Sequence, residues 1–363
     1  MDENPRPQTR KGRGAGSNPA GRFADTHSTE LDDGWSSLED PLPPLPTQVT
    51  AEAARSILTR NSSPDVPFDR SINPYRGCEH GCVYCYARPA HAYVDLSPGL
   101  DFETRLFYKP QAAELLRRTL SSPKYRCAPI ALGANTDPYQ PIERRYGITR
   151  SILETLSEFE HPVTIVTKGA AIIERDLDLL ADMARRQLVS VAISLTTLDA
   201  SLKRTLEPRA ASPRARLEAM RRLTEAGVPV AVMVAPIIPA LTDHEVESLL
   251  EAAARAGCTH AGYVVLRLPH EVEPLFVEWL NTHQPLKASR VMARVREFHG
   301  GHSYDATFGV RQTGRGTHAQ LLARRFERAC RRLGLNESAA AALDAQRFED
   351  RRTVCAGGQM SLI

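Results

Sequence analysis

Residues 76–86 read Arg-Gly-Cys-Glu-His-Gly-Cys-Val-Tyr-Cys-Tyr. Three cysteines stand within this run: Cys78, Cys82 and Cys85. The spacing Cys-x3-Cys-x2-Cys presents three thiolates from one tight loop, and Gly77 and Gly81 allow the backbone to fold closely around what the sulfur atoms hold. Three soft ligands from one loop suit an iron–sulfur cluster or zinc. Because a [4Fe–4S] cluster normally takes four protein ligands, three cysteines would leave one iron open to a small molecule.

A structural zinc site, completed by His80 or His91, is the main rival interpretation. Zinc usually takes paired Cys-x2-Cys knuckles, or a Cys/His pair from a second segment. The sequence holds no second pair. Its other four cysteines are solitary and far apart: Cys127, Cys258, Cys330 and Cys355. The pattern therefore favours an iron–sulfur cluster over zinc.

Length and composition indicate an ordinary globular protein of one large domain or two modest ones. The chain has 363 residues, of which 42% are hydrophobic and 25% charged. Seven cysteines without a regular framework favour a reducing compartment over a disulfide scaffold. The first residues show no apolar core of a signal peptide, and the longest apolar run, 228–241, is short and contains three prolines. We therefore expect a cytoplasmic protein that is not embedded in a membrane.

The first 50 residues have the composition of a disordered or loosely draped tail. They are rich in Pro, Gly, Ser and Asn and show no hydrophobic period. Residues 10–22 carry four positive charges and no negative one, and residues 41–46 read as a polyproline-type linker. A solvated tail explains this basic run better than a phosphate contact does, and a net charge of +3 does not by itself indicate nucleic acid.

From about residue 68 the chain alternates short β-branched runs with amphipathic stretches. We expect strands at 70–74, 105–108, 130–133, 163–167, 189–196, 228–235 and 261–268. We expect helices near 110–120, 149–160, 171–186, 212–226, 243–256 and 272–282. Repeated strand–helix units predict an α/β fold with a parallel sheet, open or closed into a barrel. Ligands in such folds gather at the carboxyl ends of the strands, and the cysteine loop follows the first strand.

The cysteine spacing, with the aromatic residue Tyr84 just before the last cysteine, resembles the radical S-adenosylmethionine (SAM) enzymes. This resemblance implies a partial (βα)6 TIM-type barrel in which the amino and carboxylate groups of SAM chelate the open iron. It also implies that an electron from reduced ferredoxin or flavodoxin splits SAM into methionine and a 5′-deoxyadenosyl radical, which abstracts hydrogen from a substrate. The substrate cannot be named from the sequence.

Residues 68–270 are most similar to the spore photoproduct lyase-like group. The resemblance is carried by residues 82–86 and by residues 133–143, Gly-Ala-Asn-Thr-Asp-Pro-Tyr-Gln-Pro-Ile-Glu. In the second motif it implies that Thr136 and Asp137 contact SAM, with Asp137 accepting from the ammonium or a ribose hydroxyl. The alternative for Asp137 is an ordinary turn, since Asp-Pro is common turn chemistry.

The same resemblance suggests further SAM-contacting residues at later strand ends. Lys168 would face the SAM carboxylate, for which a lysine is a suitable point charge, although a surface lysine is the commoner case. Ser194 would lie near the ribose. Tyr86 would pack on the cysteine loop or on SAM. Glu207, Arg209 and Arg216 follow, where an arginine could bind the carboxylate bidentately or form a solvated pair.

One position departs from the lyases. In those enzymes a cysteine three residues before the Asp of the second motif gives a hydrogen atom to the product radical. This chain has Ala134 there, and Cys127, seven residues earlier, is an implausible substitute. The resemblance thus supports SAM cleavage and weakens photoproduct repair as the reaction.

The resemblance to a known family says little about the last part of the chain. We expect a core over residues 51–285, after the tail of residues 1–50, and a mostly helical extension over residues 286–363. The glycine-rich run 309–316 precedes a helix with Leu321, Leu322, Phe326 and Leu333 on one face. Its other face carries Arg324, Arg328 and Arg331. That basic face and the tail leave nucleic acid as an alternative partner, and a zinc- or cluster-stabilised nucleic-acid-binding protein without catalysis as the alternative function.

Overall fold

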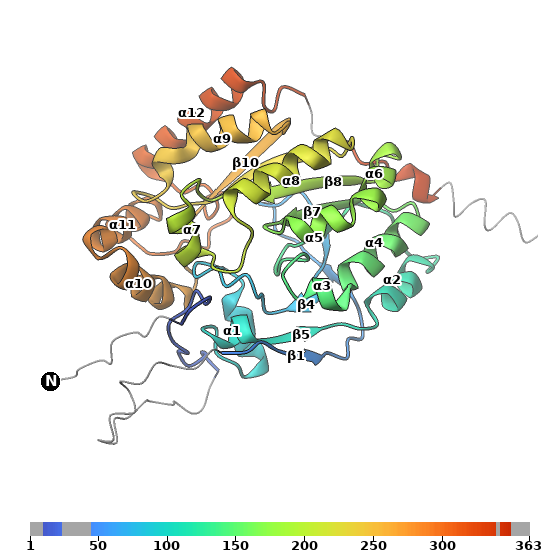
Figure 1. Cartoon of the computed structure of the whole chain (residues 1–363), viewed down its shortest axis with the longest axis horizontal. Coiled ribbons are helices and arrows are strands. Elements are labelled where there is room, and N and C mark those ends of the chain that lie inside the picture. The colour runs from blue at the N-terminus through green and yellow to red at the C-terminus, as the bar shows by residue number, and fades with distance from the viewer. Residues whose placement is uncertain (1–9, 24–44, 339–341, 350–363) are drawn as a thin grey trace, which may run out of the picture.

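The computed structural model describes residues 10–23, 45–338 and 342–349, and these form an α/β fold (Figure 1). Its larger sheet has the strand order β10-β9-β8-β7-β6-β3-β2. These strands span β2 Leu58–Arg60, β3 Arg70–Ile72, β6 Ile130–Leu132, β7 Val163–Thr167, β8 Val189–Ser194, β9 Val230–Ile237 and β10 His260–Val265. Every pairing from β3 to β10 is parallel, and only β2 joins antiparallel at the edge. Six parallel strands in chain order confirm the predicted partial (βα)6 barrel.

Helices cover the outer face of this sheet (Figure 1). The main ones are α2 Ala112–Leu120, α4 Ile148–Glu158, α5 Ala171–Arg175, α6 Leu177–Arg185, α8 Pro213–Glu225 and α9 Val246–Arg255. Shorter helices lie in the loops: η1 Arg88–Val94, α1 Asp101–Thr104, α3 Glu143–Tyr146, α7 Ala200–Leu206 and η2 Asp243–Glu245. The buried faces follow the helical period, as in α9, where Leu249, Leu250 and Ala253 are fully buried.

A second, three-stranded sheet corrects the sequence prediction. It consists of β1 Gln48–Ala51, β5 Arg105–Tyr108 and β4 Tyr75–Arg76, in the order β1-β5-β4. The strand expected at 105–108 is present, but it pairs here and not in the main sheet. The sequence did not predict β1 and β4, because β4 has two residues and β1 is mostly exposed, so neither has a hydrophobic run.

Residues 10–23, assigned from composition to a disordered or loosely draped tail, pack firmly against the body of the protein. Ala15 is 2% exposed, and the backbone N–H groups of Gly14 and Ala15 donate to Glu103. Backbone groups and glycines make these contacts, so they leave no hydrophobic period in the sequence. The expectation for residues 1–9 and for most of the 41–46 linker falls outside the described residues.

The C-terminal part is helical where it is described, with α10 Val272–His283, α11 Pro285–Phe298 and α12 Gly316–Leu333. Leu322 and Phe326 of α12 are buried, and Arg324, Arg328 and Arg331 are exposed as predicted. Leu321 is 54% exposed, so its predicted place on the inner face is wrong. The buried stripe of α12 instead continues through Ala319, Ala329 and Cys330.

The division of the chain at residue 285 stays a prediction. None of the described helices combines the length and apolar character that crossing a bilayer requires.

Candidate functional site

The three cysteines lie in a compact loop directly after β4. Cys78 and Cys82 are buried, and Cys85 is partly buried. Successive turns form the loop: the N–H of Gly81 donates to the carbonyl of Cys78, and the N–H of Cys85 to the carbonyl of Cys82. Gly81 has φ +67°, a left-handed conformation that favours glycine.

The environment of the thiols suits a cationic centre. Burial raises the pKa of Cys78 well above its usual value, raises that of Cys82 to about 12, and raises that of Cys85. The neighbouring Asp137, Cys82 and Cys85 add to the rise in the pKa of Cys78. Buried thiolates therefore need positive charge beside them, which iron supplies. This set of three soft donors fits an iron–sulfur cluster.

Each of the two histidines considered as zinc ligands has one ring nitrogen beside another protein group, and the buried Nδ1 of His91 has no hydrogen-bond partner among the described residues. His80 Nδ1 lies 3.3 Å from Asp137 Oδ2, and His91 Nε2 lies 2.9 Å from the carbonyl oxygen of Arg105. Within residues 10–23, 45–338 and 342–349, no three His, Cys, Asp or Glu side chains converge on a single metal-ion position.

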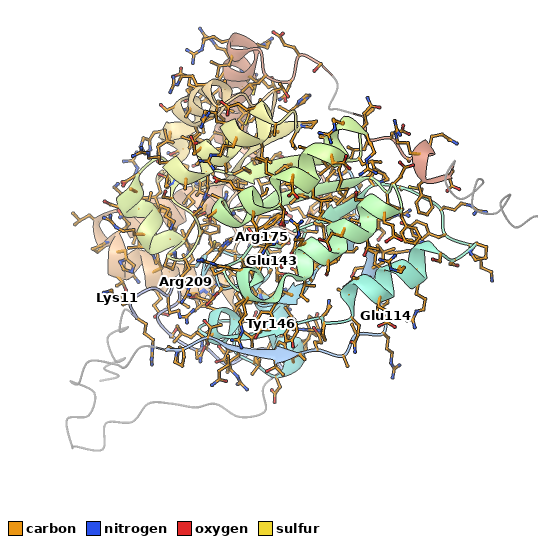
Figure 2. The ribbon with its side chains drawn as sticks, turned by 45° about the vertical axis from the view of Figure 1, so that its right-hand side comes forward. Lys11, Glu114, Glu143, Tyr146, Arg175 and Arg209 are labelled. Carbon is orange, nitrogen blue, oxygen red and sulfur yellow. The ribbon has the colours of Figure 1, made fainter. Side chains whose placement is uncertain are left out.

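The second sequence motif clamps the cysteine loop. The buried side chain of Gln140 spans it, donating from Nε2 to the carbonyl of Gly77 at 3.1 Å and accepting from the N–H of Glu79 at 2.8 Å. At the end of the motif, Glu143 is buried, accepts from the hydroxyl of Tyr75 in β4, and pairs with Arg175 at 3.1 Å (Figure 2). Gln140 and Glu143 therefore hold the beginning of the cysteine loop in place.

Asp137 joins this support and also forms the turn that the sequence left as an alternative. One carboxylate oxygen accepts from the N–H of Tyr139 at 2.9 Å and from Thr167 Oγ1 at 2.6 Å. The other accepts from the N–H of Lys168 at 2.7 Å and lies beside His80. Burial would raise the pKa of Asp137, but the charge and hydrogen bond of His80, with the bonds from Thr167 and Lys168, lower it to about 2.

The remaining predicted residues lie at strand ends around the loop. Thr136 is buried and donates from Oγ1 to the carbonyl of Tyr75 at 2.8 Å. The Lys168 ammonium lies 5.9 Å from the ring centre of Tyr84. Ser194 is buried at the end of β8. Their roles toward SAM stay predictions.

Tyr86 marks the exposed side of the loop. Its side chain is 44% exposed, its hydroxyl donates to the carbonyl of Ala134, and the guanidinium of Arg267 lies 4.4 Å from its ring centre. The ends of β6 and β10 thus meet the cysteine loop at this tyrosine.

A buried charge network behind Tyr84 was missed by the sequence analysis. Glu207 and Arg216, expected as a solvated pair or a free arginine, form a buried ion pair. Glu207 accepts from the hydroxyl of Tyr84 and from Thr196 Oγ1, and Arg216 donates to the carbonyl of Ser194 at 3.0 Å. The network therefore fixes the aromatic residue of the cysteine motif against the ends of β8 and α8.

This network predicts a specific loss of stability in acid. Burial would raise the pKa of Glu207, but the charges of Arg216 and Lys168 and the bonds from Tyr84 and Arg216 lower it from 4.5 to about 2. A lowered carboxyl pKa stabilises the folded state above the unfolded pKa, and this contribution is lost as the pH falls from about 4.5 to about 2. The shift corresponds to on the order of 3 kcal/mol. Urea denaturation at pH 6 and pH 3 should show a smaller pH-dependent loss in Glu207→Gln than in wild type, and equal losses would contradict the assignment.

The N-terminal segment supports the cysteine loop from the other side, and this too was missed. Glu103 accepts from the N–H groups of Gly14 and Ala15 at 2.9 Å each and pairs with Arg88, and both charged side chains are fully buried. Arg88 Nε in turn donates to the carbonyl of Cys82 at 2.9 Å. A Cβ on Gly14 would lie 1.8 Å from the carbonyl oxygen of Gly81, so a side chain there cannot fit without movement. The closely spaced glycines of the basic run are the one sequence signal of this packing.

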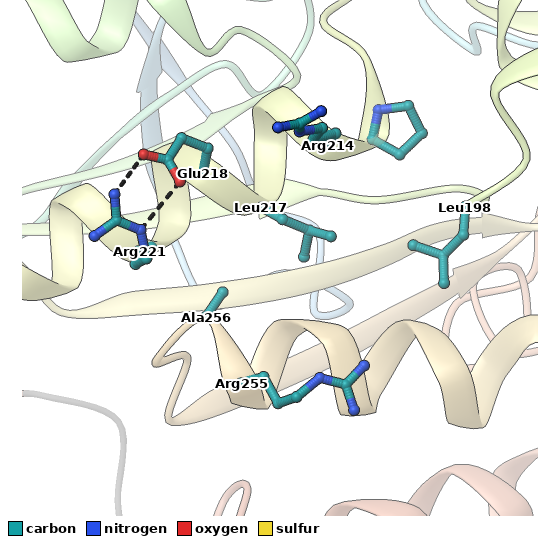
Figure 3. A pocket seen from close by; sticks show the side chains of 8 residues that line it. Leu198, Arg214, Leu217, Glu218, Arg221, Arg255 and Ala256 are labelled. Atoms are coloured by element: carbon teal, nitrogen blue, oxygen red, sulfur yellow. Dashed lines mark hydrogen bonds and ion pairs between the residues drawn. The ribbon is translucent and has the colours of Figure 1, made fainter.

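A hollow of about 500 Å³ on the outer helical layer lies apart from these residues (Figure 3). Side chains of α8 and α9, including the exposed pair Glu218 and Arg221, line it. None of the predicted site residues is among its lining.

Comparisons with known proteins agree with this geometry. The model of the radical SAM superfamily matches residues 72–253. The chain is 41% identical over 227 residues to the uncharacterized protein Rv2578c of Mycobacterium tuberculosis, and the match covers 62% of this chain and 66% of the relative. It is 28% identical over 174 residues to the uncharacterized protein MJ0683 of Methanocaldococcus jannaschii, which covers 48% of this chain and 62% of that protein. The chain thus spans just under two thirds of the length of these relatives.

Among solved structures, the fold resembles spore photoproduct lyase complexed with dinucleoside spore photoproduct, with a TM-score of 0.56 and 16% identity. The likeness covers 79% of this chain and 80% of the lyase, and it concerns the fold alone. The family match, by contrast, spans half of the chain and includes the cysteine loop with the strands that follow it. The chain belongs to the radical SAM superfamily.

Proposed function

We propose that this protein cleaves SAM reductively at a [4Fe–4S] cluster held by Cys78, Cys82 and Cys85, and that the resulting radical abstracts hydrogen from a substrate. The observation that carries the proposal is the placement of three cysteines, two of them buried, in one loop that contacts residues following the carboxyl end of β6 in the parallel sheet, in a chain of the radical SAM superfamily.

The cluster, when bound, would supply the electron that splits SAM into methionine and a 5′-deoxyadenosyl radical. The chain itself supplies a dry and fixed setting for that reaction. Cys78 and Cys82 are 7% and 8% exposed, and Gln140 and Arg88 hold the backbone of their loop. Tyr86, on the exposed side of this loop, is the residue we assign to contact SAM or the substrate.

Lys168 is the residue we assign to the SAM carboxylate. It is half-buried at the end of β7, facing the ring of Tyr84. The hydroxyl of Ser194, at the end of the next strand, is assigned to the ribose. Since the hydrogen-bonding groups of Thr136 and Asp137 already bond the protein, their contacts favour positioning the cysteine loop over binding SAM directly.

We expect Lys168→Met to weaken SAM binding by about 1–3 kcal/mol, because a charged hydrogen bond would be lost. Equilibrium dialysis of the iron-loaded protein with labelled SAM measures this, and iron content should stay unchanged. Lys124→Met, at an exposed lysine, is the matched control. Equal affinity in the two variants would show that Lys168 does not contact SAM.

We expect no clean repair of the spore-type thymine dimer. Ala134 stands where the lyases have their hydrogen-donating cysteine, so a product radical would lack that thiol. Incubation of the reduced enzyme with SAM and a dinucleotide photoproduct should give side products or uncoupled loss of SAM. Chromatography that shows clean turnover to repaired thymines would overturn this expectation.

Anaerobic reconstitution tests the proposal as a whole. The protein is loaded with iron and sulfide, reduced with dithionite and incubated with SAM, and 5′-deoxyadenosine is measured by chromatography. Formation of 5′-deoxyadenosine supports the proposal. A colourless protein that holds one zinc ion and leaves SAM intact would contradict it.

A further inference from the structure

A hollow of about 330 Å³ lies where residues 10–16 meet α7 and α10. Besides Arg13, three cationic side chains line it: Arg10, Lys11 and Arg204. In the part of the chain that the structure describes, none of the three forms an ion pair, and the buried Nε of Arg10 has no hydrogen-bond partner. The hollow therefore holds positive charge that no described carboxylate neutralises by direct pairing.

The other charged groups of the hollow do not cancel this excess. Arg13 is committed to the protein, donating to the carbonyls of Glu103 and Leu45. One carboxylate lines the hollow, that of Glu278, which accepts from the hydroxyl of Ser17 at 2.6 Å. One carboxylate among four cations leaves the wall strongly positive.

Residues that line this hollow also pack against the cysteine loop. Gly14 lines the hollow and lies against the carbonyl of Gly81, between Cys78 and Cys82. At the other side, the carbonyl of Leu206 at the end of α7 accepts from the N–H of Val83. The backbone of residues 13–15, without a long side chain at Gly14 or Ala15, thus separates the hollow from the loop.

The position of the hollow suits the entry of an electron better than the binding of a substrate. SAM and substrate would enter at the carboxyl ends of the strands, on the side where Tyr86 is exposed. An electron donor that works while they are bound must approach from another side of the cluster. The hollow offers such an approach, and its unpaired cations would attract an acidic surface by steering.

We propose that this basic hollow docks a small acidic electron-transfer protein of the flavodoxin or ferredoxin kind, which reduces the cluster from the outer side of the cysteine loop. This inference rests on the proposed function. A projecting carboxylate of the donor would enter the hollow and pair with Arg10. In the transfer the donor loses one electron, as when a flavodoxin hydroquinone becomes the semiquinone, and the cluster gains it. No proton or group needs to move.

Stopped-flow reduction of the iron-loaded full chain tests this. The triple variant Arg10→Glu, Lys11→Glu, Arg204→Glu is compared with a control of equal charge change on α12, Arg324→Glu, Arg328→Glu, Arg331→Glu. With flavodoxin hydroquinone at low ionic strength, we expect the first variant to be reduced at least about tenfold more slowly than wild type, and the control at the wild-type rate. Added salt should slow the reduction of the wild type by flavodoxin and have little effect on the reduction of the first variant. Dithionite should reduce all three proteins alike.

Several results would overturn the proposal. These are wild-type rates in the first variant at every ionic strength, an equal slowing in the α12 control, or a wild type that accepts electrons from dithionite but from neither flavodoxin nor ferredoxin. Saturable binding of inorganic phosphate that the first variant loses, with flavodoxin rates unchanged, would make the hollow a small-anion site instead. If the triple variant holds less iron, the single variant Lys11→Glu, at an exposed residue, should still be reduced more slowly than wild type by flavodoxin and at the wild-type rate by dithionite.

The outcomes also separate this inference from the proposed function. One outcome is that 5′-deoxyadenosine forms with dithionite while flavodoxin reduces the wild type and the triple variant at the same rate. This would refute the docking surface and leave the proposed function intact. Cluster reduction that depends on the hollow without SAM cleavage would refute the reaction and leave the docking surface intact. A chain that takes up no iron–sulfur cluster would refute both.

Discussion

Replacing any one of Cys78, Cys82 and Cys85 by alanine is expected to abolish the iron–sulfur absorbance. Iron content should fall from about four atoms per chain to near zero, because two remaining thiolates do not anchor a cluster in this loop. Iron and acid-labile sulfide analysis after anaerobic reconstitution measures the effect. SAM-dependent formation of 5′-deoxyadenosine should disappear with the iron.

The other described cysteines provide the matched controls. Cys258 and Cys330 are buried in the hydrophobic core, and Cys127 is half-buried next to that core. Alanine at these positions should leave the iron content unchanged, even where it costs some stability. The same expectation applies to Cys355, which lies outside the described residues. Loss of iron in these variants, with iron retained in Cys82→Ala, would contradict the assignment of the ligands.

The second large effect is expected at the pair of Arg88 and Glu103. Glu103→Gln should lower the free energy of unfolding by about 3–5 kcal/mol, because it leaves the fully buried guanidinium of Arg88 without its counter-charge. It should also reduce cluster uptake, since Arg88 holds the carbonyl of Cys82 and Glu103 holds the N-terminal segment. Urea denaturation of the iron-free chain and iron analysis of the reconstituted chain measure the two effects separately.

The exposed pair of Glu218 and Arg221 on α8 is the control for this prediction. Glu218→Gln removes a carboxylate from an arginine in the same way, but solvent replaces the lost contact, so the change in stability should be much smaller. Equal effects of the two substitutions would show that burial of the Arg88 pair does not matter. Gly14→Ala, which meets the carbonyl of Gly81, should reduce cluster uptake through the same contact.

The sequence predicts those parts of the fold that carry a strong period. The strands from β6 to β10 alternate with helices whose apolar stripes are regular, and each appears near its expected residues. β1 and β4 were missed because they are short, and β1 is mostly exposed as well. Leu321 was placed on the wrong face of α12 because the adjacent residues 321 and 322 are both leucine. Only their packing shows that Leu322 is buried and Leu321 is exposed.

The site was predictable to the extent that it depends on local spacing. Cys78, Cys82 and Cys85 follow from spacing within one loop, whereas their supports join segments far apart in the chain. A glutamate and an arginine nine positions apart look the same whether solvated or buried, so the pair of Glu207 and Arg216 could not be distinguished from a surface pair. The contact of Gly14 with Gly81 likewise depends on a fold that places residue 14 beside residue 81.

The central claim is that three cysteines hold a cluster with one iron open to SAM. Electron paramagnetic resonance of the dithionite-reduced, reconstituted protein, recorded with and without SAM, tests it most directly. We predict the signal of a reduced [4Fe–4S] cluster that changes when SAM is added, and no such signal in Cys82→Ala. A cluster signal that SAM leaves unchanged, or a reconstituted wild type without a [4Fe–4S] signal, would contradict the account.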